Sequence, residues 1–468
     1  MTGRIIVRWC GAVWCILALL GRQAAEAGDR TNIPGLGMGR TSVASSRGLD
    51  AVGINPANLA RPGDGMVSIA LSPIAVSVGS DFLTNDLYTK YFTGVATDSG
   101  RIGYSLTDAD KREILNAFPG SVGHAVADAE ARPLGIAVSL GEVGTVALTM
   151  TDRVAGMIAI PRSYMEFLFN GNPPGSFYDF SESNGVVFWS REYAVSFGKN
   201  LPSPVFLRSL SVGASLKLVH GFGYYEVERF NSTLATSADG MLDGTIDLLT
   251  RGAGLDPTGN SSMRVSPFPD VAGRGFGLDL GAAGELTDFL RVGIGVTDIG
   301  SMTWDGNVRQ TSALGTIHMD NPLDPAQRDS VEKALKGTTE QGSAFSTALP
   351  TVLRLGVAVE LHRLRGLKKL IMGELLVAAD YSQGLTGTYG SSTNPRVSLG
   401  MEYKPWSILP LRAGVSFGGV EAGVNVALGV GFHFGVFDLD LASENVEWIF
   451  SPSETAHGSL ALGMRFGI

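Results

Sequence analysis

Charged side chains recur at every second position of several apolar stretches, and these are the residues best suited to bind a ligand. Each charged residue shares its face of the stretch with Gly, Ser and Ala, while the opposite face is apolar. The set is Lys217, Asp279, Arg354, Glu360, Glu374, Asp380, Arg396, Glu402, Arg412, His433, Asp438, Asp440 and Arg465. Because both signs occur, the set fits a network of paired charges, since an unpaired buried charge is costly. It also fits an arginine or lysine, with Arg354 and Arg412 as candidates, that binds the carboxylate of an otherwise apolar ligand.

The motifs that resemble catalytic or cofactor sites lack the context that such sites need. Gly414-Val415-Ser416-Phe417-Gly418 has the Gly-x-Ser-x-Gly spacing of hydrolases, but strand alternation continues through the serine, whereas a nucleophile elbow needs a strand-to-helix turn. Gly35-x-Gly37-x-Gly39 has neither a preceding strand nor the Lys-Ser/Thr of a phosphate loop. The six histidines are scattered without ligand spacing. The sequence therefore predicts no catalytic residue, no metal site and no cofactor.

The elements that must position the charged residues are β-strands, most clearly between Arg396 and Ile468. In the first of these strands Val397, Leu399 and Met401 share one face, and the same alternation returns up to the last residue. A water-soluble sandwich would also alternate. However, the face opposite the apolar one is rich in Gly, Ala and Ser, and small residues of this kind suit the crowded lumen of a barrel. Strands of about ten residues also suit a tilted crossing of a bilayer, whereas soluble strands average about five or six.

The strand count and the connections favour a closed transmembrane barrel. We predict about 14 strands, at 67–79, 134–141, 143–151, 185–198, 208–229, 274–285, 289–299, 350–362, 371–383, 394–404, 409–418, 423–434, 436–443 and 458–468. Bacterial single-chain barrels have an even number of antiparallel strands, with short turns on one side and long loops on the other. The predicted connections alternate in this way, except the eleventh, at 419–421. The fold class is thus all-β, an antiparallel outer-membrane barrel.

Two of the long outer loops contain signals for short helices. In the first loop, Thr107 and Asp110 have the spacing of a capping box. In the seventh, Asp324 can cap a helix that begins with Pro325 and ends at Gly337. We expect these helices to pack over the barrel mouth, although they could instead serve only to order long loops. Trp189, Trp304, Trp406 and Trp448 fall at strand ends or in loops, where either an aromatic girdle or a scattered core would place them.

The chain divides into residues 1–27, 28–65 and 66–468. The first segment has an apolar run from Cys10 to Leu20 and a small-residue cleavage site at Ala25-Glu26-Ala27, which predicts a secretory signal peptide that is removed. Both cysteines lie in it, so the mature chain would have no thiol. The second segment is irregular and rich in Gly and Pro, and the third is the barrel. A formal net charge of −9 argues against a nucleic-acid partner.

The irregular segment carries a resemblance to a known family. Gly37-Met38-Gly39-Arg40, followed by Asn55-Pro56-Ala57-Asn58-Leu59, resembles the start of the FadL and TodX type of outer-membrane transporters of long-chain fatty acids and aromatic hydrocarbons. The resemblance implies a 14-stranded barrel plugged by an N-terminal hatch. It further implies that Gly37, Gly39, Asn55, Pro56 and Ala57 belong to this hatch.

The C-terminal strands are similar to another branch of that superfamily, the PorV-like proteins of type IX secretion. The similar stretches are Leu411–Gly414, Gly429–Phe432 and Phe437–Asp440. One departure from the pattern is Ile468, which stands where the barrel-assembly machinery usually reads an aromatic residue. Phe466 lies two residues earlier on the same face, so we still expect that machinery as a partner.

The expected function is an outer-membrane channel, not an enzyme, that takes up hydrophobic compounds, with long-chain fatty acids as the family default. The expected partners are outer-membrane lipid, the barrel-assembly machinery and the hydrophobic ligand. One alternative is a PorV-like protein that serves type IX secretion or surface attachment together with secretion-system proteins. Another is a structural barrel that transports nothing.

Overall fold

The computed structural model describes residues 29–61, 65–97, 100–255, 268–320, 324–387, 393–419 and 424–468, without the side chains of residues 96 and 97. The predicted signal peptide, residues 1–27, lies outside these ranges. Within them, no helix is long and apolar enough to cross a membrane.

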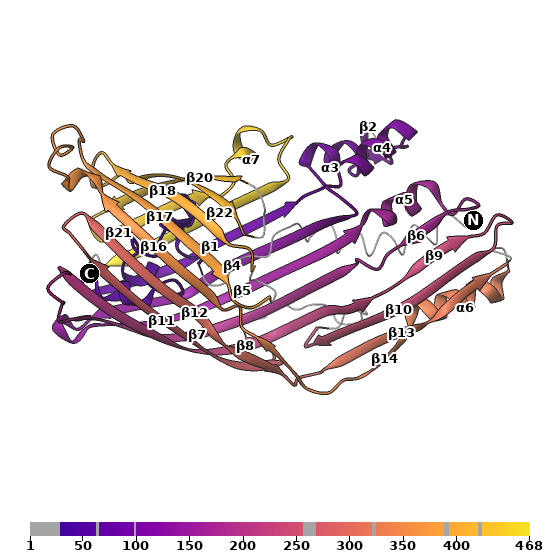
Figure 1. Cartoon of the computed structure of the whole chain (residues 1–468), viewed down its shortest axis with the longest axis horizontal. Coiled ribbons are helices and arrows are strands. Elements are labelled where there is room, and N and C mark those ends of the chain that lie inside the picture. Colours follow the sequence, from indigo (N-terminus) through magenta and orange to yellow (C-terminus); the bar gives the residue numbers. More distant parts are fainter. Residues whose placement is uncertain are drawn as a thin grey trace.

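Over the described residues, 14 long strands form a closed antiparallel barrel (Figure 1). The barrel closes because β1 (Val67–Ser80) pairs with β4 (Val122–Ser139) on one side and with β22 (His457–Gly467) on the other. The others are β5 (Thr145–Pro161), β7 (Asn184–Leu201), β8 (Ser209–Phe230), β11 (Gly273–Glu285), β12 (Leu290–Trp304), β16 (Val352–Glu360), β17 (Glu374–Gly384), β18 (Arg396–Lys404), β19 (Leu411–Gly418), β20 (Val424–Phe434) and β21 (Phe437–Ser443). Each corresponds to a strand that the sequence predicts, so the predicted fold class is confirmed.

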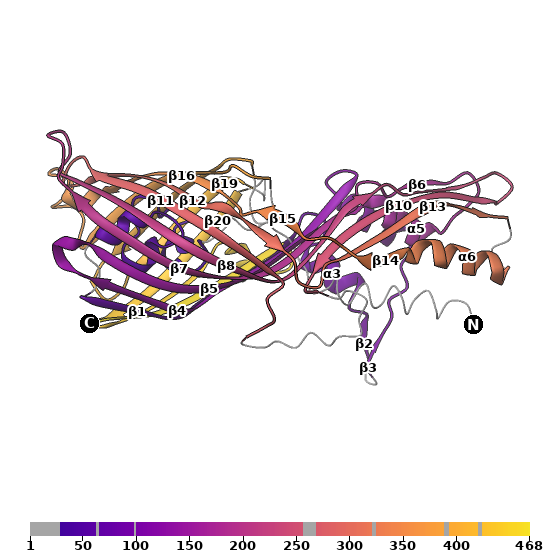
Figure 2. The same cartoon turned by 90° about the horizontal axis from the view of Figure 1, so that it is seen from below.

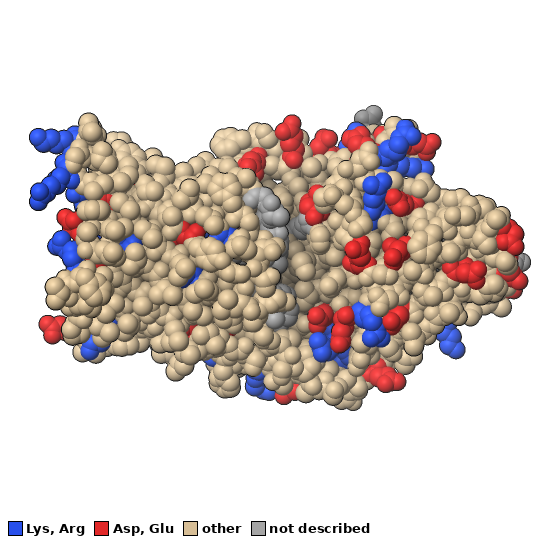
Figure 3. Space-filling model, in the orientation of Figure 1, with Lys and Arg blue, Asp and Glu red and all other residues tan. Residues whose placement is uncertain are grey.

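The outward phase of the strands is apolar. In β1 the side chains of Ile74, Val76 and Val78 are exposed, whereas those of Ala75 and Ser77 between them face inward and are buried. The same holds around the wall, and Figure 3 shows the barrel half of the molecule with few charged groups on its surface. An outward apolar belt of this kind is typical of transmembrane β-barrels.

The two ends of the barrel differ in their connections. At one end, where the chain also enters β1 and leaves β22, the strands are joined by 140–144, 202–208, 286–289, 361–373, 405–410 and 435–436. This end is called the short-turn end, and the opposite one the long-loop end. The alternation predicted from the sequence is thus present, and 361–373 is the longest of the short-side turns.

Several strands continue beyond the long-loop end, where six further strands join the same sheet, and we call this part the extension (Figure 2). β4, β5, β7 and β8 are all longer than a barrel crossing needs, and the far part of β8 pairs with β10 (Leu242–Ala253). Its other strands are β6 (Phe177–Asp179), β9 (Thr233–Thr236), β13 (Arg309–Met319), β14 (Thr338–Gln341) and β15 (Phe345–Ala348). The sequence predicted these segments as loops.

Aromatic packing stabilises the extension. Trp304 is fully buried and lies against Tyr224 and Phe345, with Phe188 in the same cluster. The glycines at 221 and 273 leave room for the Trp304 ring. Trp304 therefore belongs to a core and not to an aromatic girdle. Of the four tryptophans in the described residues, Trp406 alone is exposed.

Both predicted loop helices form, but their placement differs from the expectation. α4 (Asp108–Asn116) has the capping box of Thr107 and Asp110, and α6 (Pro325–Lys336) begins at the Asp324 cap. α6 lies along β13 at the far end of the extension and buries none of its residues, so its expected position over the barrel mouth is wrong (Figure 1). The physical reason is that the long strands carry this loop away from the barrel. The remaining short elements outside the lumen are α3 (Asn85–Tyr91), β2 (Val95–Thr97), β3 (Gly100–Ile102), η3 (Gly141–Val143), α5 (Arg162–Asn170), η4 (Leu361–Arg363) and α7 (Glu447–Phe450).

Candidate functional site

Residues 29–61 fill the barrel lumen, and we call this segment the plug (Figure 2). It contains α2 (Ile33–Gly37) and two 3-10 helices, η1 (Gly48–Ala51) and η2 (Pro56–Ala60). Asn32 caps α2 and Asn55 caps η2, each followed by a proline near the start of the helix. Because helices this short are unstable alone, the plug depends on its contacts with the wall.

The Asn-Pro-Ala motif forms the junction between the plug and the wall. Asn55 is fully buried, and its Nδ2 donates to the carbonyl oxygens of Val43 at 3.0 Å and of Ala282 at 3.2 Å. Its Oδ1 accepts from the Ala57 amide at 3.2 Å. Since Ala282 lies on β11, one side chain joins two parts of the plug to the barrel. The structure thus gives Asn55 a structural role in the predicted hatch.

Glycines on the inward face of the wall allow the plug backbone to lie directly against it. A Cβ atom at Gly414 would be 2.2 Å from the carbonyl carbon of Met38, and one at Gly293 would be 2.5 Å from the Val43 oxygen. Gly37 of the plug meets Gly429 of β20, because a Cβ at residue 37 would be 2.9 Å from the Gly429 Cα. The small residues that alternate along the strands therefore face inward and form the surface against which the plug packs.

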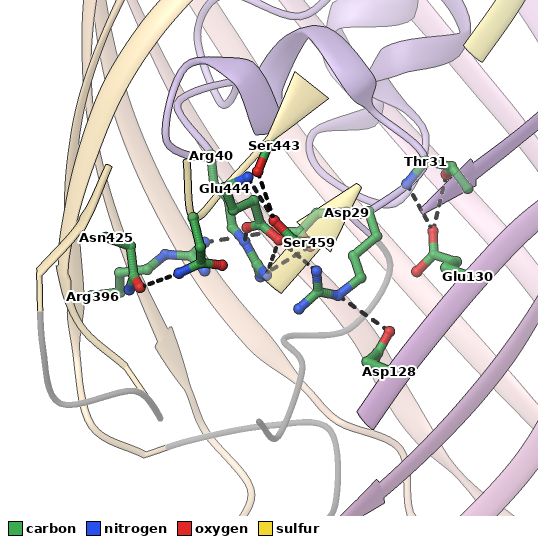
Figure 4. Close-up of polar contacts among 12 residues, drawn as sticks. Asp29, Thr31, Arg40, Asp128, Glu130, Arg396, Asn425, Ser443, Glu444 and Ser459 are labelled. Carbon is green, nitrogen blue, oxygen red and sulfur yellow. Dashed lines mark hydrogen bonds and ion pairs between the residues drawn. The ribbon is translucent and has the colours of Figure 1, made fainter. Parts of the chain in front are cut away.

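A first group of buried charges fastens the plug to β4, β18 and the residue after β21 (Figure 4). Arg30 contacts Asp128 at 3.2 Å and Glu444 at 2.5 Å. Arg40 bonds to Glu444 as well and contacts Asp29 at 3.4 Å. Each of these side chains is nearly or fully buried, so the pairs are screened little by solvent.

Further contacts of the same group involve Asp29, Thr31 and Glu130. Asp29 lies 3.6 Å from Arg396, and the Thr31 hydroxyl donates to Glu130 at 3.0 Å. Of this group the sequence predicted only Arg396 as a lumen charge, and Arg40 entered only as part of the motif that carries the family resemblance. Asp128 and Glu130 precede the strand predicted at 134–141 but lie in β4, and their period-two spacing is the sequence signal that places both on the inward face.

A second group surrounds Lys217 on β8. Its Nζ lies 3.1 Å from Asp279, 2.5 Å from Asp298 and 3.4 Å from Glu192. Asp298 has a positive φ of 58°, and its amide donates to Asp279 at 2.8 Å. One lysine is therefore held by three carboxylates. The predicted residue Arg354, also buried, donates to the Thr297 hydroxyl at 2.5 Å.

A third group lies beside the plug toward the short-turn end. Arg412 donates to Glu402 at 2.7 Å and to Asp440 at 2.6 Å, while His433 lies 3.4 Å from Asp440. Arg465 bridges the wall and the plug, with contacts to Asp438 at 3.0 Å and to Asp50 at 2.6 Å. Five of these residues border a cavity of about 80 Å³ that the plug shares with strands β17 to β20 and β22, namely Asp50, Glu402, Arg412, His433 and Arg465.

Most of the predicted lumen residues do face the interior, but they do not converge on one site. Asp380 accepts from the amides of Ser42 and Val43 at 2.6 and 2.8 Å, and Glu360 pairs with Arg291 at 2.7 Å. Glu374 is exposed, so its placement in the lumen is wrong. It is the first residue of β17, where the strand leaves the short-turn end and the alternation no longer fixes a face. Within the described residues, no group of His, Cys, Asp and Glu could hold a metal ion.

The wall between β1 and β4 is interrupted in mid-strand. Pairing stops after Ala70 opposite Gly135 and resumes at Ile74 opposite Ala131. Pro73 and Pro133 lie in the gap, and neither can donate a backbone hydrogen bond. Arg132, next to them, points inward and donates to the carbonyl oxygens of two plug residues, at 3.1 Å to Leu49 and at 3.4 Å to Val52. Pro73 and Pro133 are the sequence signal from which this interruption could have been predicted.

The chain has been compared with known proteins. No curated protein matches it. The solved structures similar to it include the TodX deltaS2S3 mutant monoaromatic hydrocarbon channel, with 15% identity, a TM-score of 0.49 and coverage of 93% of this chain and 97% of that one. The P. putida toluene transporter TodX has 14% identity, a TM-score of 0.47 and coverage of 95% and 97%. A Pseudomonas aeruginosa FadL homologue has 12% identity, a TM-score of 0.49 and coverage of 96% and 99%.

A family model matches residues 56–444, which include the Asn-Pro-Ala junction from Pro56 onward and the barrel strands from β1 to β21. The chain belongs to this family, described as a family of unknown function (DUF5723).

Proposed function

We propose that this protein is an outer-membrane channel that takes up hydrophobic small molecules. The observation that carries the proposal is the separable plug, which contributes no strand to the barrel and is held in the lumen by ion pairs, hydrogen bonds and glycine contacts. A sealed structural barrel could be filled by its own wall side chains. The plug is instead a separate segment, so it could move within the lumen without breaking hydrogen bonds between the barrel strands.

The apolar belt and the alternation of connections support an outer-membrane location. On this assignment the short-turn end faces the periplasm and the extension stands outside. The buried aromatic cluster of Trp304, Tyr224 and Phe345 then lies on the outer side of the barrel, within the extension.

The ligand class is the finer part of the proposal. Arg412 already binds two carboxylates, and Lys217 binds three. A fatty acid would have to displace one of these partners, whereas an uncharged hydrocarbon would not. The similar structures are hydrocarbon channels and a FadL homologue, and those activities are theirs. Uncharged hydrocarbons and fatty acids are therefore the two ligand classes to test here.

The direct experiment is a binding titration of the purified protein in detergent with a fluorescent long-chain fatty acid. Unlabelled acid and an uncharged alkane serve as competitors, and heat-shifted gel mobility checks that the barrel is folded. Saturable binding that both competitors reduce supports uptake of hydrophobic compounds in general, while competition by the acid alone supports a fatty-acid channel. A folded protein that binds neither refutes the channel.

The extension favours a second candidate, a PorV-like role in secretion or surface attachment. It holds six strands outside the barrel circuit, together with α6, and presents a large surface beyond the long-loop end (Figure 2). A secreted protein or a secretion-system component would bind there. Co-purification of a partner that is lost when α6 and β14 are deleted would support this role, and absence of both ligand binding and a partner would leave a structural barrel.

A further inference from the structure

The turn at 361–373, which we call the basic turn, concentrates positive charge in an acidic protein. Its sequence, LHRLRGLKKLIMG, has Arg363, Arg365, Lys368 and Lys369 and no acidic residue, although the whole chain has a net charge of −9. The turn is ordered by its own backbone, since the Leu367 amide donates to Leu364 at 3.0 Å. The charges are therefore presented together on a compact structure.

Three of the four basic side chains have no carboxylate partner among the described residues. Arg365, Lys368 and Lys369 are exposed and make no ion pair there. Arg363 differs, because it is tethered to buried Glu360 and donates to the Asp288 carbonyl oxygen at 3.0 Å. It anchors the turn and leaves the other three free to meet an anion.

Apolar side chains are exposed beside these charges. Leu370 and Met372 are 77% and 82% exposed, and Trp406 of the neighbouring turn at 405–410 is 66% exposed. The two turns lie against each other, because a Cβ at Gly373 would be 3.0 Å from the Pro405 Cα. The Tyr403 hydroxyl, at the end of β18, also donates to the Met372 carbonyl oxygen at 2.9 Å. Basic and apolar groups thus form one continuous surface.

This surface lies where the apolar belt ends. Leu355 and Val357, exposed on the outward face of β16, lead directly into the turn. Figure 3 shows basic side chains gathered at this edge of the barrel, with the uncharged belt beside them. The position corresponds to the boundary between hydrocarbon and headgroups, where tryptophan and basic residues are commonly found.

We infer that the basic turn and Trp406 form a binding site for the phosphate headgroups of anionic phospholipids in the leaflet at the short-turn end. Arg365, Lys368 and Lys369 attract the phosphate, while Leu370, Met372 and Trp406 enter the upper part of the acyl region. An acidic protein segment would satisfy the charges but would leave the apolar side chains without a partner. The continuity with the lipid-facing belt therefore favours a lipid.

The test uses the full-length mature protein in phosphatidylcholine vesicles that contain either brominated phosphatidylglycerol or brominated phosphatidylcholine at the same mole fraction. Bromine quenches nearby tryptophan, and the part of the signal due to Trp406 is the difference from the Trp406→Phe variant. We expect stronger quenching by the anionic lipid, with a preference that falls as salt rises. Each basic residue removed should reduce the relative association about fivefold.

Two triple variants with equal charge change make the result specific. Arg365→Gln, Lys368→Gln and Lys369→Gln together should abolish the preference. Arg112→Gln, Lys333→Gln and Lys336→Gln, on helices α4 and α6 far from the short-turn end, should preserve it. Heat-shifted mobility confirms folding of each variant.

Equal quenching by the two lipids, or a preference that survives in the first triple variant, would overturn the inference. So would inorganic phosphate at millimolar concentration that removes the preference at constant ionic strength, because the site would then recognise the free anion. The inference does not depend on transport, and a protein that binds no hydrophobic ligand would give the same result.

Discussion

At the scale of single residues, the wall glycines and the buried charges decide whether the plug is seated. The contacts at Gly414 and Gly293 leave no room for a methyl group. Glu444 accepts from two plug arginines at once. Changes at these positions should affect the plug before they affect the strands.

Gly414→Ala should destabilise the protein by about 1–3 kcal/mol, because the new methyl group overlaps the Met38 carbonyl and the plug backbone must move. Denaturant unfolding followed by tryptophan fluorescence measures the change. Gly315→Ala on β13 is the matched control, since a Cβ there meets no atom within 4 Å. Equal stabilities of the two variants would contradict the fitted contact.

Glu444→Ala should cost about 3–5 kcal/mol, because it leaves Arg30 and Arg40 buried without their shared carboxylate. Unfolding in urea gives the free energy, and protease cleavage within residues 29–61 reports loosening of the plug. Glu332→Ala, which removes an exposed pair with Lys336 on α6, should change stability by less than about 1 kcal/mol. If Glu444→Ala resembles this control, the ion pairs do not hold the plug.

At the scale of elements, the plug and the barrel behave as two parts with a defined interface. α2 packs against β19 to β22, and η2 against β7, β8 and β11. The proposed channel requires this interface to rearrange. The interruption between β1 and β4, where Arg132 bonds to the η1 region, is a place where the wall itself has fewer hydrogen bonds to break.

A disulfide between α2 and β22 should lock the plug. A Cβ at Gly463 would be 3.7 Å from the Ile33 Cβ, a separation that suits a disulfide. In the mature form of Ile33→Cys/Gly463→Cys, uptake of a hydrophobic compound into cells or vesicles should stop when the pair is oxidised and return on reduction. Each single cysteine variant serves as the control. Uptake that is equal in the oxidised and reduced forms would show that this part of the plug does not move.

At the scale of the whole molecule, the barrel and the extension have separate cores. The barrel lumen is filled by the plug, and the extension by the cluster around Trp304. A substitution that destabilises one core should therefore leave the other folded. Such variants can distinguish the function of the extension from that of the barrel.

Trp304→Ala should cost about 3–5 kcal/mol of local stability, because it empties the centre of the extension. Limited proteolysis should then cut within β10, β13 and β14, while the remaining barrel keeps its heat-shifted mobility. Loss of that mobility in the variant would mean that the two cores unfold together. Ligand binding by the proteolysed barrel would place the site in the lumen, and its loss would place it in the extension.

Local sequence patterns are sufficient to predict the barrel. The alternation in the 14 predicted strands, the alternating connection lengths, the capping box of α4 and the Asp324 cap of α6 are local signals, because period two and helix caps depend on neighbouring residues. The same two-residue alternation correctly predicted that Lys217, Arg354 and Arg412 face the lumen. The predicted lumen position of Glu374 was wrong because alternation does not fix the face of a residue at a strand end.

The pairing of the charges and the position of the long loops depend on the tertiary fold. Arg40 and Glu444 are 404 residues apart in the chain, and no local pattern pairs them. The extension forms because Trp304, Tyr224 and Phe345 converge from three strands, although each alone looks like a loop or strand-end aromatic. Pairing between distant segments depends on barrel closure and on packing of the plug, and these are properties of the whole fold.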